Sequence, residues 1–125
     1  MIGYSTVGTN DLAAASAFYD QVFAEAGVKR LLDFGPVGLY WGKSLEQPTF
    51  GVMRPFDGEP ATVGNGSMVA FALRDSALVD AMYAKAMALG GKDEGPPGLR
   101  DGNFYAAYFR DLDGNKLVAY SIVPA

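Results

Sequence analysis

The sequence contains neither histidine nor cysteine. Without cysteine the chain has no disulfides, thiolate metal sites or cysteine nucleophile, and without histidine it lacks the commonest metal ligand and general base. Long apolar runs are also missing, since no segment approaches the roughly 18 apolar residues that would span a bilayer. The start, MIGYSTVGTNDL, lacks the basic and apolar regions of a secretory signal. We therefore expect a cytoplasmic protein with no membrane partner.

Clustered positive charge is absent as well. The chain has 10 Lys and Arg against 14 Asp and Glu, a formal net charge of -4, and the cations are scattered. Because binding through phosphate neutralisation needs a basic face, we expect no nucleic-acid partner. What is present is an ordinary globular composition, 50% hydrophobic and 19% charged, in 125 residues. That length fits one domain with one core.

Two segments have the apolar spacing of amphipathic helices. The first starts at a cap on Asn10 or Asp11 and stops at Gly27, and the second starts at Asp75 and stops at the pair Gly90 and Gly91. An offset of 64 residues superposes the two segments, which indicates two copies of one unit, although any two alanine-rich helices would match comparably. The aligned pairs include Asp11 with Asp75, Ala17 with Ala81, Tyr19 with Tyr83, and Gly27 with Gly91.

Strand-like segments flank each predicted helix in the same order. They are 2–8, 28–34, 37–41 and 49–54 in the first half, and 68–73, 92–94, 104–110 and 116–122 in the second. Each half therefore predicts a βαβββ unit and the chain an α+β fold. We expect module 1 at about 1–58, a linker rich in Gly and Pro at about 55–67, and module 2 at about 67–125. A ferredoxin-like pair of split units is the alternative, with fewer strands.

Two motifs in this arrangement carry a family resemblance: GTNDLAAASAFYDQVF near the start and FRDLDGNKLVAY near the end. Together they resemble the vicinal oxygen chelate superfamily, which includes glyoxalase I, extradiol dioxygenases and bleomycin-resistance proteins. The resemblance covers nearly the whole chain and implies one glyoxalase/bleomycin-resistance-like domain over 1–125. In it, two βαβββ modules form a curved eight-stranded cup with the helices outside. Enzymes of the family hold a divalent metal there, which polarises two neighbouring substrate oxygens.

The ligand positions of that metal carry other residues in this chain. The motifs place them on Tyr4, Met68 and Val118, and the offset of 64 nominates Arg54 as the fourth. A slip of one residue would turn a strand over, yet the two residues on either side of each position include no Asp, Glu or His. We therefore expect a family member without the metal site and without a cofactor. The aspartates of the turn at 111–115 are expected to serve the turn itself.

Strand alternation predicts which side chains line the cup. If Tyr4 points into the cup, Thr6 two residues later points there too, and counting from Arg54 places Val52 in the cup in the same way. Arg54 is a candidate for holding a carboxylate or phosphate; the alternative is that it ends its strand in solvent or pairs with Asp57 or Glu59. The segment 94–103 is expected to be a long loop, either a rim of the cup or a solvated connection. The candidate ligand-binding residues are Tyr4, Thr6, Tyr40, Trp41, Arg54, Met68, Phe104, Tyr108 and Val118.

The resemblance leaves three classes of function open. The first, which we favour, is metal-independent binding of a small organic molecule, with anions among the candidates, in a mixed apolar and aromatic cup. Drug-sequestering family members do this and usually form dimers, so we expect a homodimer. The second is a lyase, isomerase or dioxygenase-type enzyme, with Tyr4, Tyr108, Glu94 and Asp101 as proton-transfer candidates. The third is an interaction or regulatory module whose own side chains fill the cup.

Overall fold

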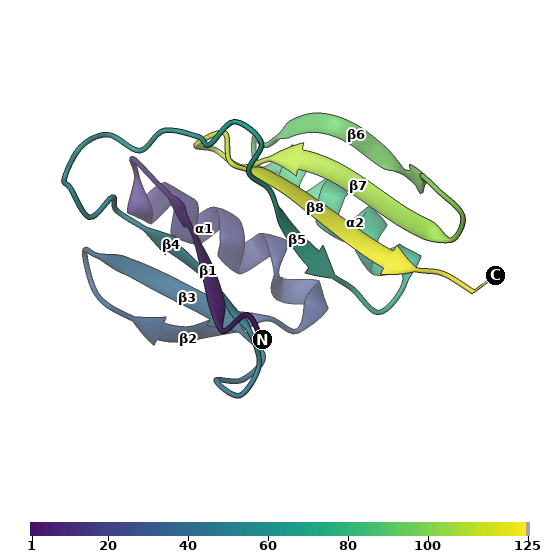
Figure 1. Ribbon diagram of the computed structural model, residues 1–125, viewed down its shortest axis with the longest axis horizontal. Coiled ribbons are helices and arrows are strands. Elements are labelled where there is room, and N and C mark those ends of the chain that lie inside the picture. The colour runs from purple at the N-terminus through teal and green to yellow at the C-terminus, as the bar shows by residue number, and fades with distance from the viewer. Residues whose placement is uncertain (125) are drawn as a thin grey trace.

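Two units of the same design follow each other along the chain (Figure 1). The computed structural model describes residues 1–124. The first unit consists of β1 (Tyr4–Gly8), α1 (Leu12–Val22), the short 3-10 helix η1 (Ala24–Ala26), β2 (Lys29–Asp33), β3 (Gly38–Gly42) and β4 (Thr49–Met53). The second consists of β5 (Val69–Ala72), α2 (Ser76–Ala88), β6 (Lys92–Leu99), β7 (Phe104–Arg110) and β8 (Lys116–Ile122). The predicted βαβββ order is confirmed, and three strands after each helix reject the ferredoxin-like alternative.

Both helices begin at aspartate caps, and of the two candidates for the first helix, Asn10 and Asp11, the cap is Asp11. The Asp11 carboxylate accepts a hydrogen bond from the Ala14 backbone N–H at 3.0 Å, and Asp75 accepts one from Leu78 at 3.0 Å. These bonds satisfy N–H groups that have no partner within the helix. The first helix passes into η1 and ends at Gly27, whose φ of 72° is the left-handed conformation that glycine adopts readily. No helix within residues 1–124 is both long and apolar enough to cross a membrane.

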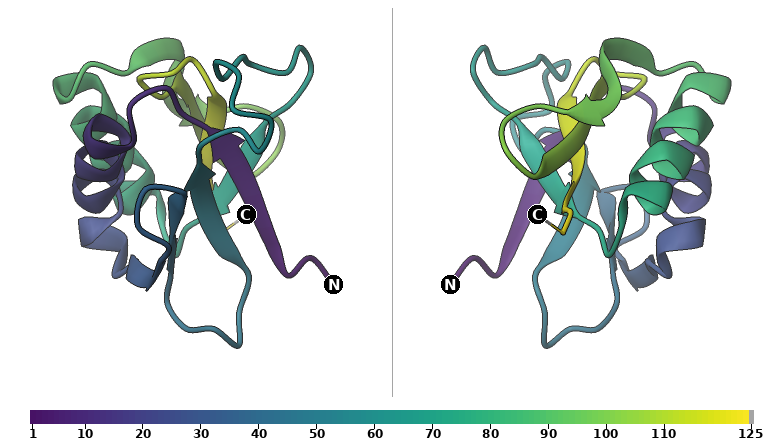
Figure 2. Two further views of the ribbon diagram at one scale, coloured as in Figure 1. Left: turned by 90° about the vertical axis from the view of Figure 1, so that its left-hand side faces the viewer. Right: turned by 90° about the vertical axis from the view of Figure 1, so that its right-hand side faces the viewer.

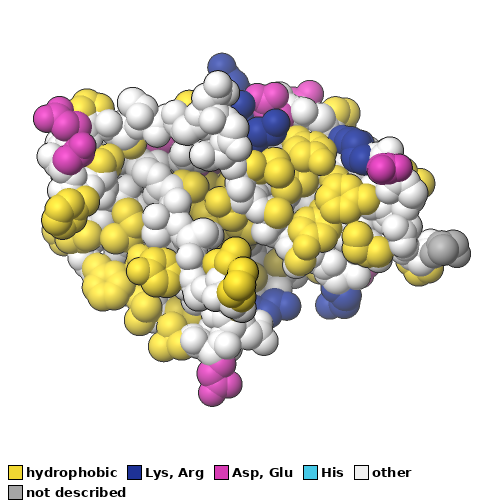
Figure 3. All heavy atoms as spheres, viewed as in Figure 1, with side chains coloured by type: hydrophobic (Ala, Val, Ile, Leu, Met, Phe, Trp, Pro, Cys, Tyr) yellow, Lys and Arg dark blue, Asp and Glu magenta, His cyan; other side chains and the backbone are white. Residues whose placement is uncertain are grey.

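In each unit the strands form one four-stranded mixed sheet. The strand orders are β1-β4-β3-β2 and β5-β8-β7-β6, and the first strand of each unit pairs in parallel with the last. Helices α1 and α2 lie on the same side of the molecule, against one face of the two sheets (Figure 2). We call the opposite face of the sheets the cup face. It is turned toward the viewer in Figure 3, where hydrophobic side chains gather over both units.

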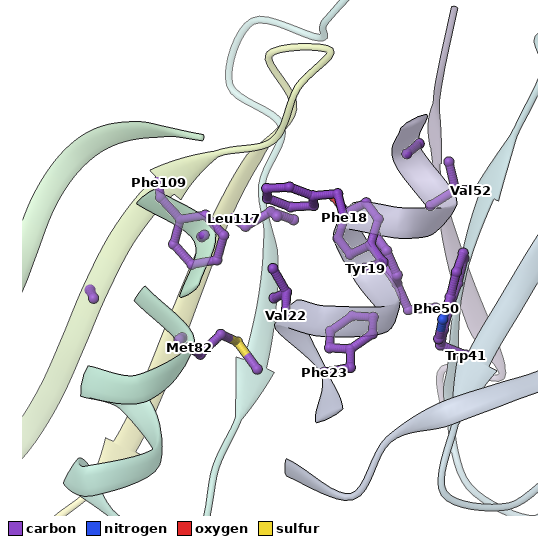
Figure 4. Packing of buried hydrophobic residues seen from close by; sticks show 14 of the residues in the cluster. Phe18, Tyr19, Val22, Phe23, Trp41, Phe50, Val52, Met82, Phe109 and Leu117 are labelled. Carbon is purple, nitrogen blue, oxygen red and sulfur yellow. The ribbon is translucent and has the colours of Figure 1, made fainter. Parts of the chain in front are cut away.

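One hydrophobic core lies between the helices and the sheets and joins the two units (Figure 4). The ring of Phe71 on β5 packs against Phe23 and Phe50 of the first unit, with ring centres 5.1 and 5.2 Å apart. Val52 belongs to this core and is 1% exposed, so its predicted place on the cup face was wrong. On β4 the side chains of Phe50 and Val52 point into the core. Gly51, which lies between them, pairs with Thr6 and Tyr40 of the neighbouring strands and therefore belongs to the cup face.

Part of the expected loop at 94–103 is a strand instead. β6 continues to Leu99 and forms the outer edge of its sheet. Its pairing with β7 shifts register around the glycines, with Gly95 opposite Tyr108 and Gly98 opposite Ala106. Two adjacent prolines are tolerated there because an edge strand has N–H positions that need no partner. The glycines and prolines of this segment therefore predicted a loop, whereas the structure has an irregular edge strand as far as Leu99.

The acidic turn between β7 and β8 joins the two units. Asp111 is buried, and its Oδ1 accepts hydrogen bonds from the backbone N–H groups of Asp113 and Asn115, which confirms the turn role. Its Oδ2 accepts a 2.5 Å hydrogen bond from the Tyr19 hydroxyl of α1. The Asn115 side chain donates to the carbonyl of Gly8 at 2.9 Å. The motif thus fastens the last hairpin to the first unit.

Candidate functional site

A cavity of about 550 Å³ opens on the cup face of the first unit. Three neighbouring strands build its floor, because Thr6 of β1 and Tyr40 of β3 both lie opposite Gly51 of β4. The loop after β4 forms the remaining wall. The lining includes Tyr4, Thr6, Tyr40, Met53, Arg54 and Phe56. We call this cavity the first pocket.

The aromatic wall of the first pocket depends on a glycine. A Cβ atom on Gly51 would lie 2.5 Å from the Tyr40 ring, so the ring rests directly on the backbone of β4. The Tyr4 ring meets Tyr40 edge to face, with ring centres 5.5 Å apart and an interplanar angle of 89°. Such a pair is a favourable aromatic geometry. The wall is therefore held in place while its outer surface stays open to a ligand.

Arg54 places a positively charged guanidinium group on the wall of the first pocket. It follows the last residue of β4, and its backbone N–H donates to the Val37 carbonyl at 2.9 Å, which holds the start of the loop beside β3. Its guanidinium forms no ion pair within residues 1–124. Asp57 also lines the first pocket, and its carboxylate accepts a hydrogen bond from the Glu59 backbone N–H rather than from Arg54. A guanidinium in this position can hold a carboxylate or phosphate through two hydrogen bonds.

The cup face of the second unit is apolar along its strands and cationic at its rim. Tyr108 lies opposite Val118 in the register of β7 and β8, and Phe104 stacks on Tyr120 with ring centres 5.1 Å apart. In Figure 3 hydrophobic side chains cover this region, with Lys and Arg beside them. The cations near Tyr108 are Arg100, 5.5 Å from the ring centre, and Lys116, at 5.7 Å.

The structure divides the predicted site residues into three groups. Those that line the first pocket are Tyr4, Thr6, Tyr40 and Arg54. Those of the second unit are Phe104, Tyr108 and Val118 on β7 and β8, and Met68 just before β5; of these, Val118 is buried at 2% exposure. Trp41 is in neither place: it is fully buried on the helix-facing side of β3, where its indole N–H donates to Asp20 at 3.0 Å.

Sequence reasoning missed Met53 and Phe56 in the lining of the first pocket, and Gly51 against the Tyr40 ring. Gly51 and Met53 lie on the cup face because Gly51 pairs with Thr6 of β1 and Tyr40 of β3. The prediction counted alternation from Arg54, which lies beyond the end of β4. A glycine opposite an aromatic residue on the next strand is the signal that fixes this register. Phe56 lies in the loop, where no periodicity points to it.

The donor set does not fit a divalent metal. Within residues 1–124, no three side chains of His, Cys, Asp or Glu come together as a group that could hold an ion. The first pocket places a phenol and a guanidinium where the family resemblance puts metal ligands. Divalent ions prefer carboxylate, imidazole or thiolate ligands, and a guanidinium repels them.

Comparisons with known proteins agree with this fold. A family model described as the Glyoxalase/Bleomycin resistance protein/Dioxygenase superfamily matches residues 1–119. The crystal structure of a glyoxalase/bleomycin resistance protein from Albidiferax ferrireducens T118 is 37% identical, covers 99% of both chains and has a TM-score of 0.89. A lactoylglutathione lyase from Agrobacterium tumefaciens shares the fold at 23% identity and a TM-score of 0.71, covering 97% of this chain and 92% of that chain. A search of curated proteins found no match.

Proposed function

This chain belongs to the glyoxalase/bleomycin resistance protein/dioxygenase superfamily, and we propose that it binds a small organic molecule on its cup face without a metal ion. The first pocket is the observation that carries the proposal. Its volume of about 550 Å³ falls within the range of roughly 300 to 1,000 Å³ for small-molecule sites. An open cavity of this size also argues against a cup filled by the chain's own side chains.

The lining of the first pocket favours a flat organic anion. Tyr4 and Tyr40 offer ring surfaces to an apolar body, and Thr6 offers a hydroxyl. Arg54, with no ion pair of its own in residues 1–124, would hold an acidic group. An aromatic carboxylate matches both features, with its ring on the tyrosines and its carboxylate on the guanidinium.

We also propose that a second copy of the chain covers part of the cup face. Large apolar side chains on and beside this face are exposed in the single chain, including Ile2 at 64%, Tyr4 at 64% and Ile122 at 58%. Large contiguous patches of exposed apolar side chains commonly mark sites where a protein binds a partner. Met68, Phe104, Tyr108 and Val118 would then contribute to a pocket shared by two chains in a closed dimer. Sedimentation equilibrium at several protein concentrations tests this, and a monomer throughout would contradict it.

Calorimetric titration with matched ligand pairs tests the proposed ligand. We expect 1-naphthoate to bind and the neutral 1-naphthamide to bind at least tenfold more weakly. Arg54→Gln should remove most of this difference. Arg74→Gln is the matched control, because Arg74 is a surface arginine paired with Asp75. Equal binding of acid and amide, or equal effects of the two substitutions, would contradict the assignment of Arg54.

A further inference from the structure

We propose that the second unit carries an anion site of its own, in which Lys116 and Arg110 bind the acidic head of an amphiphilic organic anion. The apolar body of the ligand would lie along the cup face of β7 and β8. This inference rests on the proposed function in one respect, that the cup face takes an organic molecule rather than a metal ion. It concerns residues that lie outside the first pocket.

The two cations occupy paired positions on neighbouring strands of the cup face. Arg110 and Lys116 are paired residues in the antiparallel register of β7 and β8. Like charges directly opposite each other on one sheet face are unfavourable. Arg110 is partly compensated, since its Nε donates to Glu94 at 2.6 Å and its Nη1 to the Gly114 carbonyl at 2.9 Å. Lys116 forms no ion pair within residues 1–124. Two cations and one carboxylate therefore leave one uncompensated positive charge.

The uncompensated charge lies beside open space. A cavity of about 450 Å³ is lined by Arg110, Lys116, Met68 and the loop 63–67. This loop supplies the Ser67 hydroxyl and backbone groups flanked by glycines, which can donate hydrogen bonds to an anion. The cavity thus offers a charged group, polar partners and room for a carboxylate, sulfonate or phosphate head.

An apolar strip leads away from this cavity. It starts at Tyr108, whose ring lies 5.7 Å from the Lys116 ammonium, and continues to the stacked rings of Tyr120 and Phe104, while Val118 on the same face is only 2% exposed. From Lys116 to Tyr120 the strand spans about 13 Å, at roughly 3.3 Å per residue. That length accommodates a two-ring body or a medium aliphatic chain. The site thus has positive charge at one end and apolar surface along the rest of its length, which matches an amphiphilic anion.

Charge also favours a small anion over a second copy as the occupant of the cationic end. The first pocket contributes Arg54 to the same side of the molecule. A partner that approached with this part of its cup face would add a further cation and leave the charge uncompensated. An organic anion neutralises the site in either the single chain or a dimer.

The test uses two fluorescent probes that differ in charge. 8-Anilinonaphthalene-1-sulfonate is an amphiphilic anion, and N-phenyl-1-naphthylamine is its neutral counterpart. We expect the wild-type protein to bind the sulfonate with an affinity that falls as salt rises. Lys116→Gln should weaken sulfonate binding at least fivefold and change binding of the neutral probe less than twofold. Lys116→Arg should retain sulfonate binding, and unchanged unfolding curves would show that the variants are folded.

The outcomes separate this site from the first pocket. Equal losses for both probes would show that Lys116 acts through its apolar stem and would overturn the anion site. Loss of sulfonate binding in Arg54→Gln but not in Lys116→Gln would place the probe in the first pocket, overturning this inference while supporting the proposed function. Absence of sulfonate binding by the wild type would also overturn it, and titration with 1-naphthoate would then test the first pocket separately.

Discussion

Replacing Tyr19 with phenylalanine tests how the acidic turn joins the two units. The Tyr19 hydroxyl donates to the buried Asp111 carboxylate at 2.5 Å, across 92 positions of sequence. The substitution removes this hydrogen bond but keeps the ring, which packs against Phe50 and Trp41 with centres 5.0 and 5.8 Å apart. Its cost therefore reports mainly the link between α1 and the β7–β8 turn.

The expected loss is about 2 kcal/mol in the free energy of unfolding. Hydrogen bonds to charged groups contribute about 1.5 to 3 kcal/mol. The lower part of this range applies because Asp111 Oδ2 keeps a second donor, the Asn115 side-chain amide at 3.0 Å. With an unfolding entropy of about 2.1 cal/mol/K per residue, the melting temperature of a chain this long should fall by about 8 °C.

Urea unfolding followed by circular dichroism measures the loss, with Tyr83→Phe as the matched control. Tyr83 is the repeat equivalent of Tyr19 and donates to Asp93 at 3.0 Å, but this bond lies at the surface. We expect Tyr83→Phe to change the free energy by less than about 0.5 kcal/mol. Similar losses in the two variants, or less than about 0.5 kcal/mol in Tyr19→Phe, would refute the role of the buried link.

Three further predictions concern Tyr19, Gly51 and Trp41. Burial, followed by the charge of the neighbouring Asp111, raises the pKa of the Tyr19 hydroxyl well above its usual value. The stability that the protonated hydroxyl contributes is therefore fully present below the unfolded pKa of about 10 and is lost as the pH rises above it. Unfolding curves should show that stability falls less at alkaline pH in Tyr19→Phe than in the wild type. Gly51→Ala should push the Tyr40 ring into the first pocket and weaken 1-naphthoate binding at least fivefold, and unchanged affinity by calorimetry would contradict the geometry of this wall. Trp41→Phe should lower the melting temperature but leave 1-naphthoate affinity within twofold, because Trp41 lies in the core, and a larger loss of affinity would place it in the site.

The helices were predictable because their signals are local. Asp11 and Asp75 cap the two helices, and the glycines that follow each helix end its amphipathic pattern. The order of strands followed from turn residues and from the repeat. The turn at 111–115 was predicted as a turn, but its contact with Tyr19 joins residues far apart in sequence, and no local pattern encodes such a partner.

The site was only partly predictable because strand faces depend on register. Alternation counted from Arg54 placed Val52 on the cup face, but Arg54 lies beyond the end of β4, and the pairing with β1 and β3 places Gly51 and Met53 there instead. Trp41 was ambiguous for the same reason, since an aromatic residue in a strand suits either face. The loop that carries Phe56 beside the first pocket has no periodic pattern, so alternation could not assign Phe56 to the pocket.

Calorimetric titration of the chelator-stripped protein with Mn(II), Fe(II), Ni(II) and Zn(II) tests the central claim most directly. The claim is that the cup face binds an organic molecule without a metal ion. We predict no specific one-to-one binding of any of these ions at micromolar concentration, in the wild type or in Arg54→Ala. Stoichiometric binding at micromolar affinity or better would contradict the account, because it would require a ligand set that the cup face, as described, does not contain.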